Sequence, residues 1–207
     1  MAERPSSKKM GRVERKKTGM PFFLFFFFLI YGAFHFYNYR KVSAALQPTW
    51  PVRLALALWM GIMVVTPILV RGLEQAGYER LARIVSFGGY SWLGLLFLFV
   101  TTAAVLDLLV LLAGLGNKFT LRSRNFLQLS PQTRFFFPLL LALGIFVYGF
   151  FEARDLRTEH VQVATSKLPP EMDRLRIVQI SDVHLGLLVR QQRLAKILAL
   201  VREARPD

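Results

Sequence analysis

The sequence predicts an α-helical membrane bundle of about four transmembrane helices, followed by the first strands and helix of an α/β domain. Hydrophobic residues make up 54% of the 207 residues and phenylalanine alone occurs 19 times, which is too apolar for an average soluble domain. The apolar residues gather into long runs that are separated by cations. After residue 152 the pattern changes to short alternating segments and one amphipathic helix.

The formal net charge is +14, and the cations flank the apolar runs. This distribution favours contact with the anionic headgroups of a lipid bilayer, where each basic residue contributes about 1 kcal/mol. Nucleic acid is the other usual partner of a basic chain, and it is not expected here. The chain has no cysteine, which excludes disulfides, thiolate zinc sites and iron–sulfur clusters.

Residues 1–20 are polar and basic without an apolar period, and they are expected to form a basic cytoplasmic tail. The first span is expected at 21–39, where nineteen residues cover roughly 28 Å, close to the thickness of a bilayer's hydrocarbon core. A cleaved signal peptide is the competing interpretation, since Ser43-Ala44-Ala45 resembles a cleavage site. We favour an uncleaved helix because further spans follow.

The remaining transmembrane spans belong with the first to one anchor domain, expected over residues 21–152. The third is the least defined, because its apolar stretch already begins at Ile84; the Gly88-Gly89 pair indicates that the span itself begins at Tyr90. The expected spans after the first are 54–70, 90–116 and 135–151.

Orientation follows from the distribution of Lys and Arg. The loops carry similar numbers of cations, whereas seven Lys and Arg residues precede the first span. The N-terminus is therefore expected in the cytoplasm. An even number of spans returns residues 153–207 to the same side. The expected location is a multi-pass protein of the cell (inner or plasma) membrane.

Residues 153–207 are expected to begin a second domain. The segment 160–166 alternates in the manner of a strand, and 175–180 is rich in β-branched residues that suit a buried strand. A helix is expected from about Arg190, with an apolar face at Leu194, Ile197, Leu198 and Val201.

Asp182 and His184 follow the second expected strand, in the run RIVQISDVHLG. Open α/β sheets place their ligands at the carboxyl ends of strands, and residues two apart in an extended chain point to the same side. A carboxylate and an imidazole can then converge on one metal ion. The carboxylate can bridge to a second ion, and imidazole suits Mn, Fe or Zn. Gly186 permits a tight turn before the helix.

This run resembles the opening motif of calcineurin-like metallophosphoesterases, in the membrane-anchored bacterial branch. The segments YGFFEARDLR and Lys167-Leu168-Pro169 are similar to what precedes the motif there, so the resemblance covers about residues 148–207. It implies an α/β metallophosphoesterase sandwich and hydrolysis of a phosphoester by a hydroxide held between two divalent metal ions (Mn, Fe or Zn). Asp182 and His184 would bind the first ion.

The family's later motifs, Gly-Asp-x-x-Asp, Gly-Asn-His-Glu/Asp and Gly-His-x-His, do not occur in the sequence. Two ligands cannot hold a pair of metal ions. We therefore expect a truncated front part of a longer enzyme, inactive alone, with no catalytic or substrate-binding residue assigned. A substrate that is a lipid-linked phosphoester is a reasonable expectation for a domain tethered to a bilayer.

Two alternatives stay open. Asp182 and His184 also fit a loop pair that satisfies backbone donors. The chain also fits a small membrane interaction or transport module with Asp107 as its working residue, because an intramembrane carboxylate is a functional candidate. For Asp107 we favour a hydrogen bond to a neighbouring helix, since no other acid or lysine lies within the spans. His35 is expected to be a packing residue and His160 a surface residue.

Overall fold

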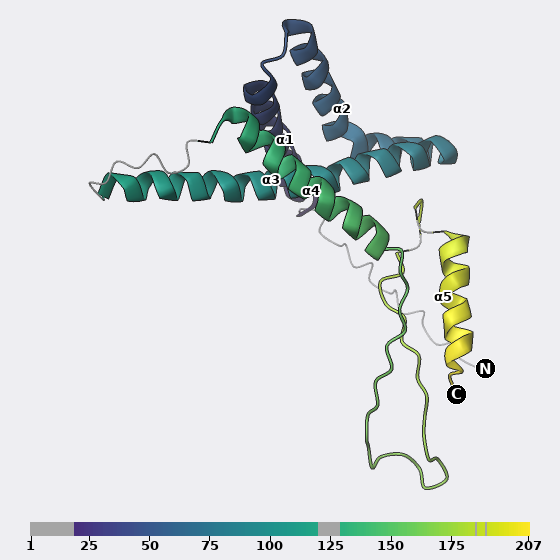
Figure 1. Ribbon diagram of the computed structural model, residues 1–207. Helices are drawn as coiled ribbons and strands as arrows, with labels where there is room; N and C mark the ends of the chain where they lie inside the picture. Colours follow the sequence, from purple (N-terminus) through teal and green to yellow (C-terminus); the bar gives the residue numbers. More distant parts are fainter. Residues whose placement is uncertain (1–18, 120–128, 185, 189) are drawn as a thin grey trace, which may run out of the picture.

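The computed structural model describes residues 19–119, 129–184, 186–188 and 190–207. Residues 1–18, which include most of the basic tail, and the loop cations Arg122 and Arg124 lie outside the described residues. The described chain forms five helices in the order α1 (Gly19–Leu46), α2 (Trp50–Gln75), α3 (Glu79–Phe119), α4 (Pro131–Glu152) and α5 (Gln191–Ala204), as Figure 1 shows.

Four of these helices are long and apolar enough to cross a membrane: Phe22–Leu46, Trp50–Gln75, Glu79–Gly116 and Pro131–Glu152. The helices α1 to α4 each contain one of the spans expected from the sequence. The third is the longest, because its 38 residues measure about 57 Å, nearly twice the hydrocarbon thickness. This helix is therefore strongly tilted or continues beyond the hydrocarbon core.

Local sequence explains where the helices meet their turns. The α2–α3 turn contains Gly77 at φ 81°, a left-handed conformation that glycine adopts without strain. The first residue of α4 is Pro131, whose missing N–H costs nothing at that position. The hydroxyl of Ser130 accepts a hydrogen bond of 3.1 Å from the backbone N–H of Thr133 and so caps the same helix.

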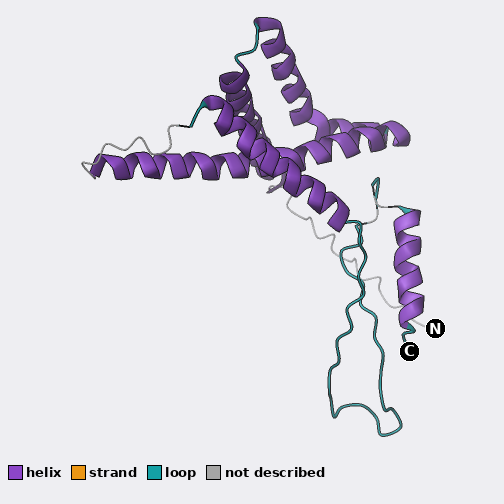
Figure 2. Ribbon diagram, in the orientation of Figure 1, coloured by secondary structure: helices purple, strands orange, loops and turns teal. Residues whose placement is uncertain are grey.

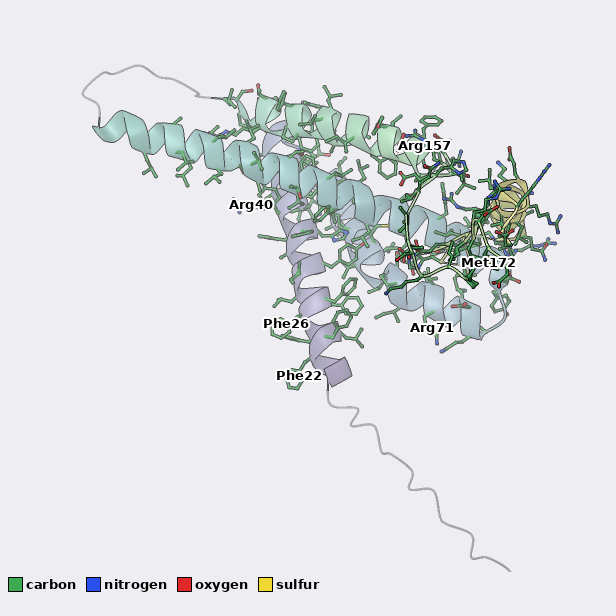
Figure 3. All side chains as sticks on the ribbon, turned by 90° about the horizontal axis from the view of Figure 1, so that it is seen from below. Phe22, Phe26, Arg40, Arg71, Arg157 and Met172 are labelled. Atoms are coloured by element: carbon green, nitrogen blue, oxygen red, sulfur yellow. The ribbon has the colours of Figure 1, made fainter. Side chains whose placement is uncertain are left out.

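The core lies where α1, α3 and α4 cross. It is a cluster of buried side chains from these three helices: Val42, Ala45, Phe99, Ala103, Phe135 and Ala142. Most other apolar side chains are exposed, including Phe22 and Phe26, which project from α1 in Figure 3. A bilayer accounts for such a surface, since lipid tails are as apolar as the side chains that face them. The length and apolar composition of the four helices indicate that the chain is a membrane protein.

The expected α/β sandwich is wrong for the described residues. No strand occurs in them, and Figure 2 draws the chain between α4 and α5 as loop. The segments 160–166 and 175–180 lie in this loop, and a chain segment becomes a strand only when its N–H and C=O groups bond to a neighbour. Val161, Val163 and Ile177 are all exposed. Their β-branched pattern permits a strand without supplying the partner that forms one.

The helix expected from about Arg190 is present as α5, Gln191–Ala204. Within the part of the chain that the structure describes, α5 packs against none of the other helices, and it stands beside the loop in Figure 1. None of its residues is buried.

Candidate functional site

Asp182 and His184 lie in the segment that joins the membrane helices to α5. Their side chains are close together, with 3.7 Å between His184 Nε2 and Asp182 Oδ1. This is within ion-pair range but longer than a hydrogen bond. The His184 side chain is 81% exposed and the Asp182 side chain is 86% exposed, so both are accessible to an ion from solvent.

The backbone at the two residues differs from the extended geometry expected from the sequence. Asp182 has φ 54° and His184 has φ 47°, so both adopt the left-handed conformation. Asp and His are among the side chains that tolerate it best, although each such residue costs about 1–3 kcal/mol. The side chains therefore meet through a kinked backbone. A Cβ placed on Gly186 would touch nothing within 4 Å, so no described neighbour requires glycine there.

The segment before the motif is held by the end of α5. The backbone N–H of Arg176 donates to Asp207 Oδ2 at 2.7 Å, and the N–H of Asp207 donates to the carbonyl of Arg176 at 3.1 Å. The Arg176 guanidinium also donates to the carbonyl of Ala204 at 3.0 Å. These bonds close a loop of the chain around the motif and satisfy a carbonyl at the C-terminus of α5.

A second set of contacts ties the motif to the membrane helices. Arg190, immediately before α5, forms an ion pair with Glu79 at the start of α3. Leu188 lies against the α3–α4 surface, where it lines a groove together with Phe87 and Phe150. The residues on the far side of the motif are thus attached to the membrane part of the molecule.

The donor types at Asp182 and His184 fit a divalent transition metal, since carboxylate oxygen and neutral imidazole are ordinary ligands of Mn, Fe and Zn. Their number is small: the described residues contain no group of three or more His, Asp or Glu side chains that could hold an ion. Catalytic zinc sites use three protein ligands. A functional centre at this motif needs ligands beyond these two residues.

Asp107, the other candidate, has partners that the sequence did not reveal. Its Oδ1 accepts from Lys41 Nζ at 2.6 Å and its Oδ2 from the Tyr37 hydroxyl at 2.7 Å. Lys41 lies beyond the first expected span, 21–39, but α1 continues to Leu46 and carries this residue to the bundle. Both carboxylate oxygens are thereby used in joining α1 to α3. A functional role for Asp107 stays a prediction.

His35 forms a second polar contact between the same helices. Its Nε2 accepts from Trp92 Nε1 at 2.9 Å, and its Nδ1 lies 2.8 Å from the carbonyl of Tyr31. Because an indole N–H can only donate, the proton of the neutral ring is on Nδ1. The His35 side chain is buried, which confirms it as a packing residue. Its hydrogen bond with Trp92 makes it an interhelical polar contact as well. His160 is exposed, as expected.

The sequence patterns did not predict these contacts between side chains. The Lys41–Asp107, His35–Trp92 and Glu79–Arg190 pairs join residues that are far apart in the chain. The single available signal was the position of Lys41, one helical turn after Tyr37 and therefore on the same face of a continued α1.

Comparison with known proteins gives one informative likeness. No family model and no solved structure matches the chain. A zebrafish (Danio rerio) protein described as "Transmembrane protein with metallophosphoesterase domain" is 34% identical over 70 residues. The aligned part is 33% of this chain and 16% of the relative, so the chain corresponds to a small part of that protein's length. With the four apolar helices, this likeness supports a membrane protein related to metallophosphoesterase-domain proteins.

Proposed function

We propose that the chain is part of a membrane-anchored, metal-dependent phosphoesterase in which Asp182 and His184 bind the first of two divalent ions. The observation that carries the proposal is the pair itself: a carboxylate and an imidazole 3.7 Å apart, both exposed, in the run RIVQISDVHLG. The likeness to a transmembrane protein with a metallophosphoesterase domain supports the same class of reaction.

In this proposal each part of the chain has a separate task. Residues 21–152 anchor the enzyme, and residues 153–207 carry the first metal ligands on the cytoplasmic side. When bound, two divalent ions (Mn, Fe or Zn) would supply a hydroxide and would neutralise the phosphate oxygens; Asp182 and His184 would hold the first of them. The chain's own contribution is to hold Asp182 and His184 together, between the Arg176–Asp207 contacts and the Arg190–Glu79 ion pair.

The remaining ligands are expected in the sequence that follows Asp207 in the gene. The resemblance predicts Gly-Asp, Gly-Asn-His and Gly-His-x-His motifs there. Absence of these motifs from the complete reading frame would refute the proposal.

The direct test is hydrolysis of bis(p-nitrophenyl) phosphate in the presence of Mn²⁺ by the protein of the complete reading frame, in membranes. Asp182→Asn and His184→Ala should each lower the rate by more than about a hundredfold, because losing a ligand disturbs a metal site more than losing a supporting residue does. His160→Ala is the matched control, since this histidine is exposed and outside the motif. Equal loss in all three variants, or in none, contradicts the roles given to Asp182 and His184.

A further inference from the structure

An apolar groove runs between α3 and α4 at the end of the bundle where the motif segment is attached. Its volume is about 450 Å³, and it is an open trough rather than an enclosed cavity. The walls include Phe87 and Leu98 of α3, Phe146, Gly149 and Phe150 of α4, and Leu188 of the motif segment. Both helices that form the groove are candidate membrane spans.

Cations surround the outer end of this groove. Arg83 lies one helical turn before Phe87 and shares Glu79 with Arg190; its Nε is buried and has no hydrogen-bond partner in the described chain. Arg154 follows α4, and its guanidinium carbon lies 4.0 Å from the centre of the Phe150 ring.

The nearby carboxylates leave this positive charge incompletely balanced. Glu152 and Asp155 both pair with Arg157, which is labelled at the end of α4 in Figure 3. Glu79 has to serve both Arg83 and Arg190. Among the described residues, Arg154 therefore has no carboxylate partner. An apolar trough with a cationic outer end is complementary to an apolar chain that carries an anionic head.

The groove is also close to the proposed metal ligands along the chain. Leu188 is four residues after His184, and four residues span at most about 14 Å even when fully extended. The Arg190–Glu79 ion pair fixes the segment just beyond Leu188 to α3. His184 therefore lies within about 14 Å of the part of the groove wall that Leu188 forms.

We infer that the α3–α4 groove binds the acyl chain of a phosphate-bearing lipid, whose phosphate lies among Arg83, Arg154 and the Asp182–His184 pair. This inference rests on the proposed function and names its substrate class: a phosphoester embedded in the bilayer. A free, water-soluble phosphoester would use the cations but would leave the apolar groove unfilled.

The test uses the full 207-residue chain in phosphatidylcholine nanodiscs that contain phosphatidic acid with a diazirine near the end of one acyl chain. After illumination, the labelled peptides are identified by mass spectrometry. Labelling is expected on the groove residues of α3 and α4. Uniform labelling of all lipid-facing helices, including the exposed face of α1, would overturn the inference.

Gly149→Leu is the diagnostic variant, because Gly149 lines the groove and a Cβ there meets nothing within 4 Å. The larger side chain should occupy the groove and reduce labelling about tenfold, which corresponds to about 1.4 kcal/mol. Gly144→Leu is the matched control: it is on the same helix, has equally open surroundings and does not line the groove. Equal labelling of the two variants would overturn the inference.

A second comparison examines the phosphate. Diacylglycerol with the same diazirine has no phosphate and should label the groove about tenfold less than phosphatidic acid does. The Arg154→Gln variant should reduce this preference for phosphatidic acid. Equal labelling by both lipids would overturn the assignment of the cations to a phosphate.

These outcomes separate the inference from the proposed function. Groove labelling with no phosphoester hydrolysis by the complete protein would count against the enzyme and leave the lipid site standing. Hydrolysis of a soluble phosphodiester without groove labelling would leave the enzyme standing and refute the lipid site.

Discussion

Asp107 shows what a single carboxylate does inside this bundle. Lys41 and Tyr37 donate to its two oxygens at 2.6 and 2.7 Å. The negative charge of Asp107 and the positive charge of Lys41 therefore compensate each other across the α1–α3 contact. The Lys41 side chain is 13% exposed and that of Asp107 is 34% exposed, which makes the pair partly shielded from solvent. A shielded ion pair adds little over an apolar pair, but leaving one member without the other is costly.

Replacing either member alone should therefore destabilise the bundle more than replacing both. Asp107→Leu and Lys41→Met are each expected to lower the free energy of unfolding by about 1–3 kcal/mol, because each leaves a polar group without its charged partner. The double variant Lys41→Met/Asp107→Leu should recover part of that loss. The measurement is denaturation in detergent, read from tryptophan fluorescence. If the losses simply add, the two residues are not coupled.

The sequence identified Asp107 but not its partner, and the reason is physical. The apolar run ends near Tyr39, whereas α1 continues to Leu46 because its backbone bonds do not depend on apolar side chains. Lys41 therefore belongs to a helix and reaches inward with its apolar stem. Asp182 and His184 were predicted from their spacing, their place after an expected strand and the resemblance of the surrounding run. Their left-handed backbone was not predicted, because a sequence motif does not specify φ.

At the scale of elements, the α2–α3 contact depends on Gly89. The Gly88-Gly89 pair was expected to precede the third span, but it lies inside α3. A Cβ on Gly89 would come within 2.2 Å of the Cγ2 methyl of Thr66 on α2, whereas a Cβ on Gly88 would meet nothing within 4 Å. Thr66 is buried, and its hydroxyl donates to the carbonyl of Ile62 at 3.0 Å, so it cannot easily turn away. Small residues allow membrane helices to approach closely, as Gly89 does here.

Gly89→Ala is accordingly expected to lower the free energy of unfolding by about 1–3 kcal/mol through overpacking. Gly88→Ala is the control and should be neutral or stabilising by up to about 1 kcal/mol, the usual gain of alanine in a helix. Adding Thr66→Ser removes the clashing methyl and should rescue Gly89→Ala. Thermal denaturation in one detergent compares all four proteins. A stable Gly89→Ala protein would show that the helices separate without cost.

The elements that the sequence predicted well are those whose stability is local. Apolar runs long enough to span a bilayer must satisfy their backbone internally, so the four long helices followed from composition and length. The amphipathic period of α5 likewise sufficed to place it. The segments 160–166 and 175–180 were expected as strands, but a strand depends on a partner elsewhere in the chain. The described residues provide none, and local pattern alone could not reveal that.

At the scale of the whole molecule, the described connections place one turn at one end of the bundle and two segments at the other end. The α1–α2 turn includes Thr49 and the α2–α3 turn includes Tyr78, so they lie at opposite ends of α2. The segment after α4 emerges at the same end as the start of α3, because Leu188 and Arg190 reach Phe87 and Glu79 there. If the basic N-terminus is cytoplasmic, Tyr78 and the Asp182–His184 pair are cytoplasmic as well.

The absence of cysteine allows this orientation to be tested with single-cysteine variants free of background. Thr49→Cys, Tyr78→Cys and Thr158→Cys are suitable because all three residues are exposed and the Thr49 side chain makes no cap hydrogen bond. In intact cells a membrane-impermeant maleimide should label Thr49→Cys and leave Tyr78→Cys and Thr158→Cys unlabelled until the cells are broken. The three variants control one another, because Tyr78→Cys and Thr158→Cys should be labelled from the same side of the membrane and Thr49→Cys from the opposite side. Labelling of Thr158→Cys from outside would place Asp182 and His184 on the outer side of the membrane, and the substrate would then have to be sought in the outer leaflet.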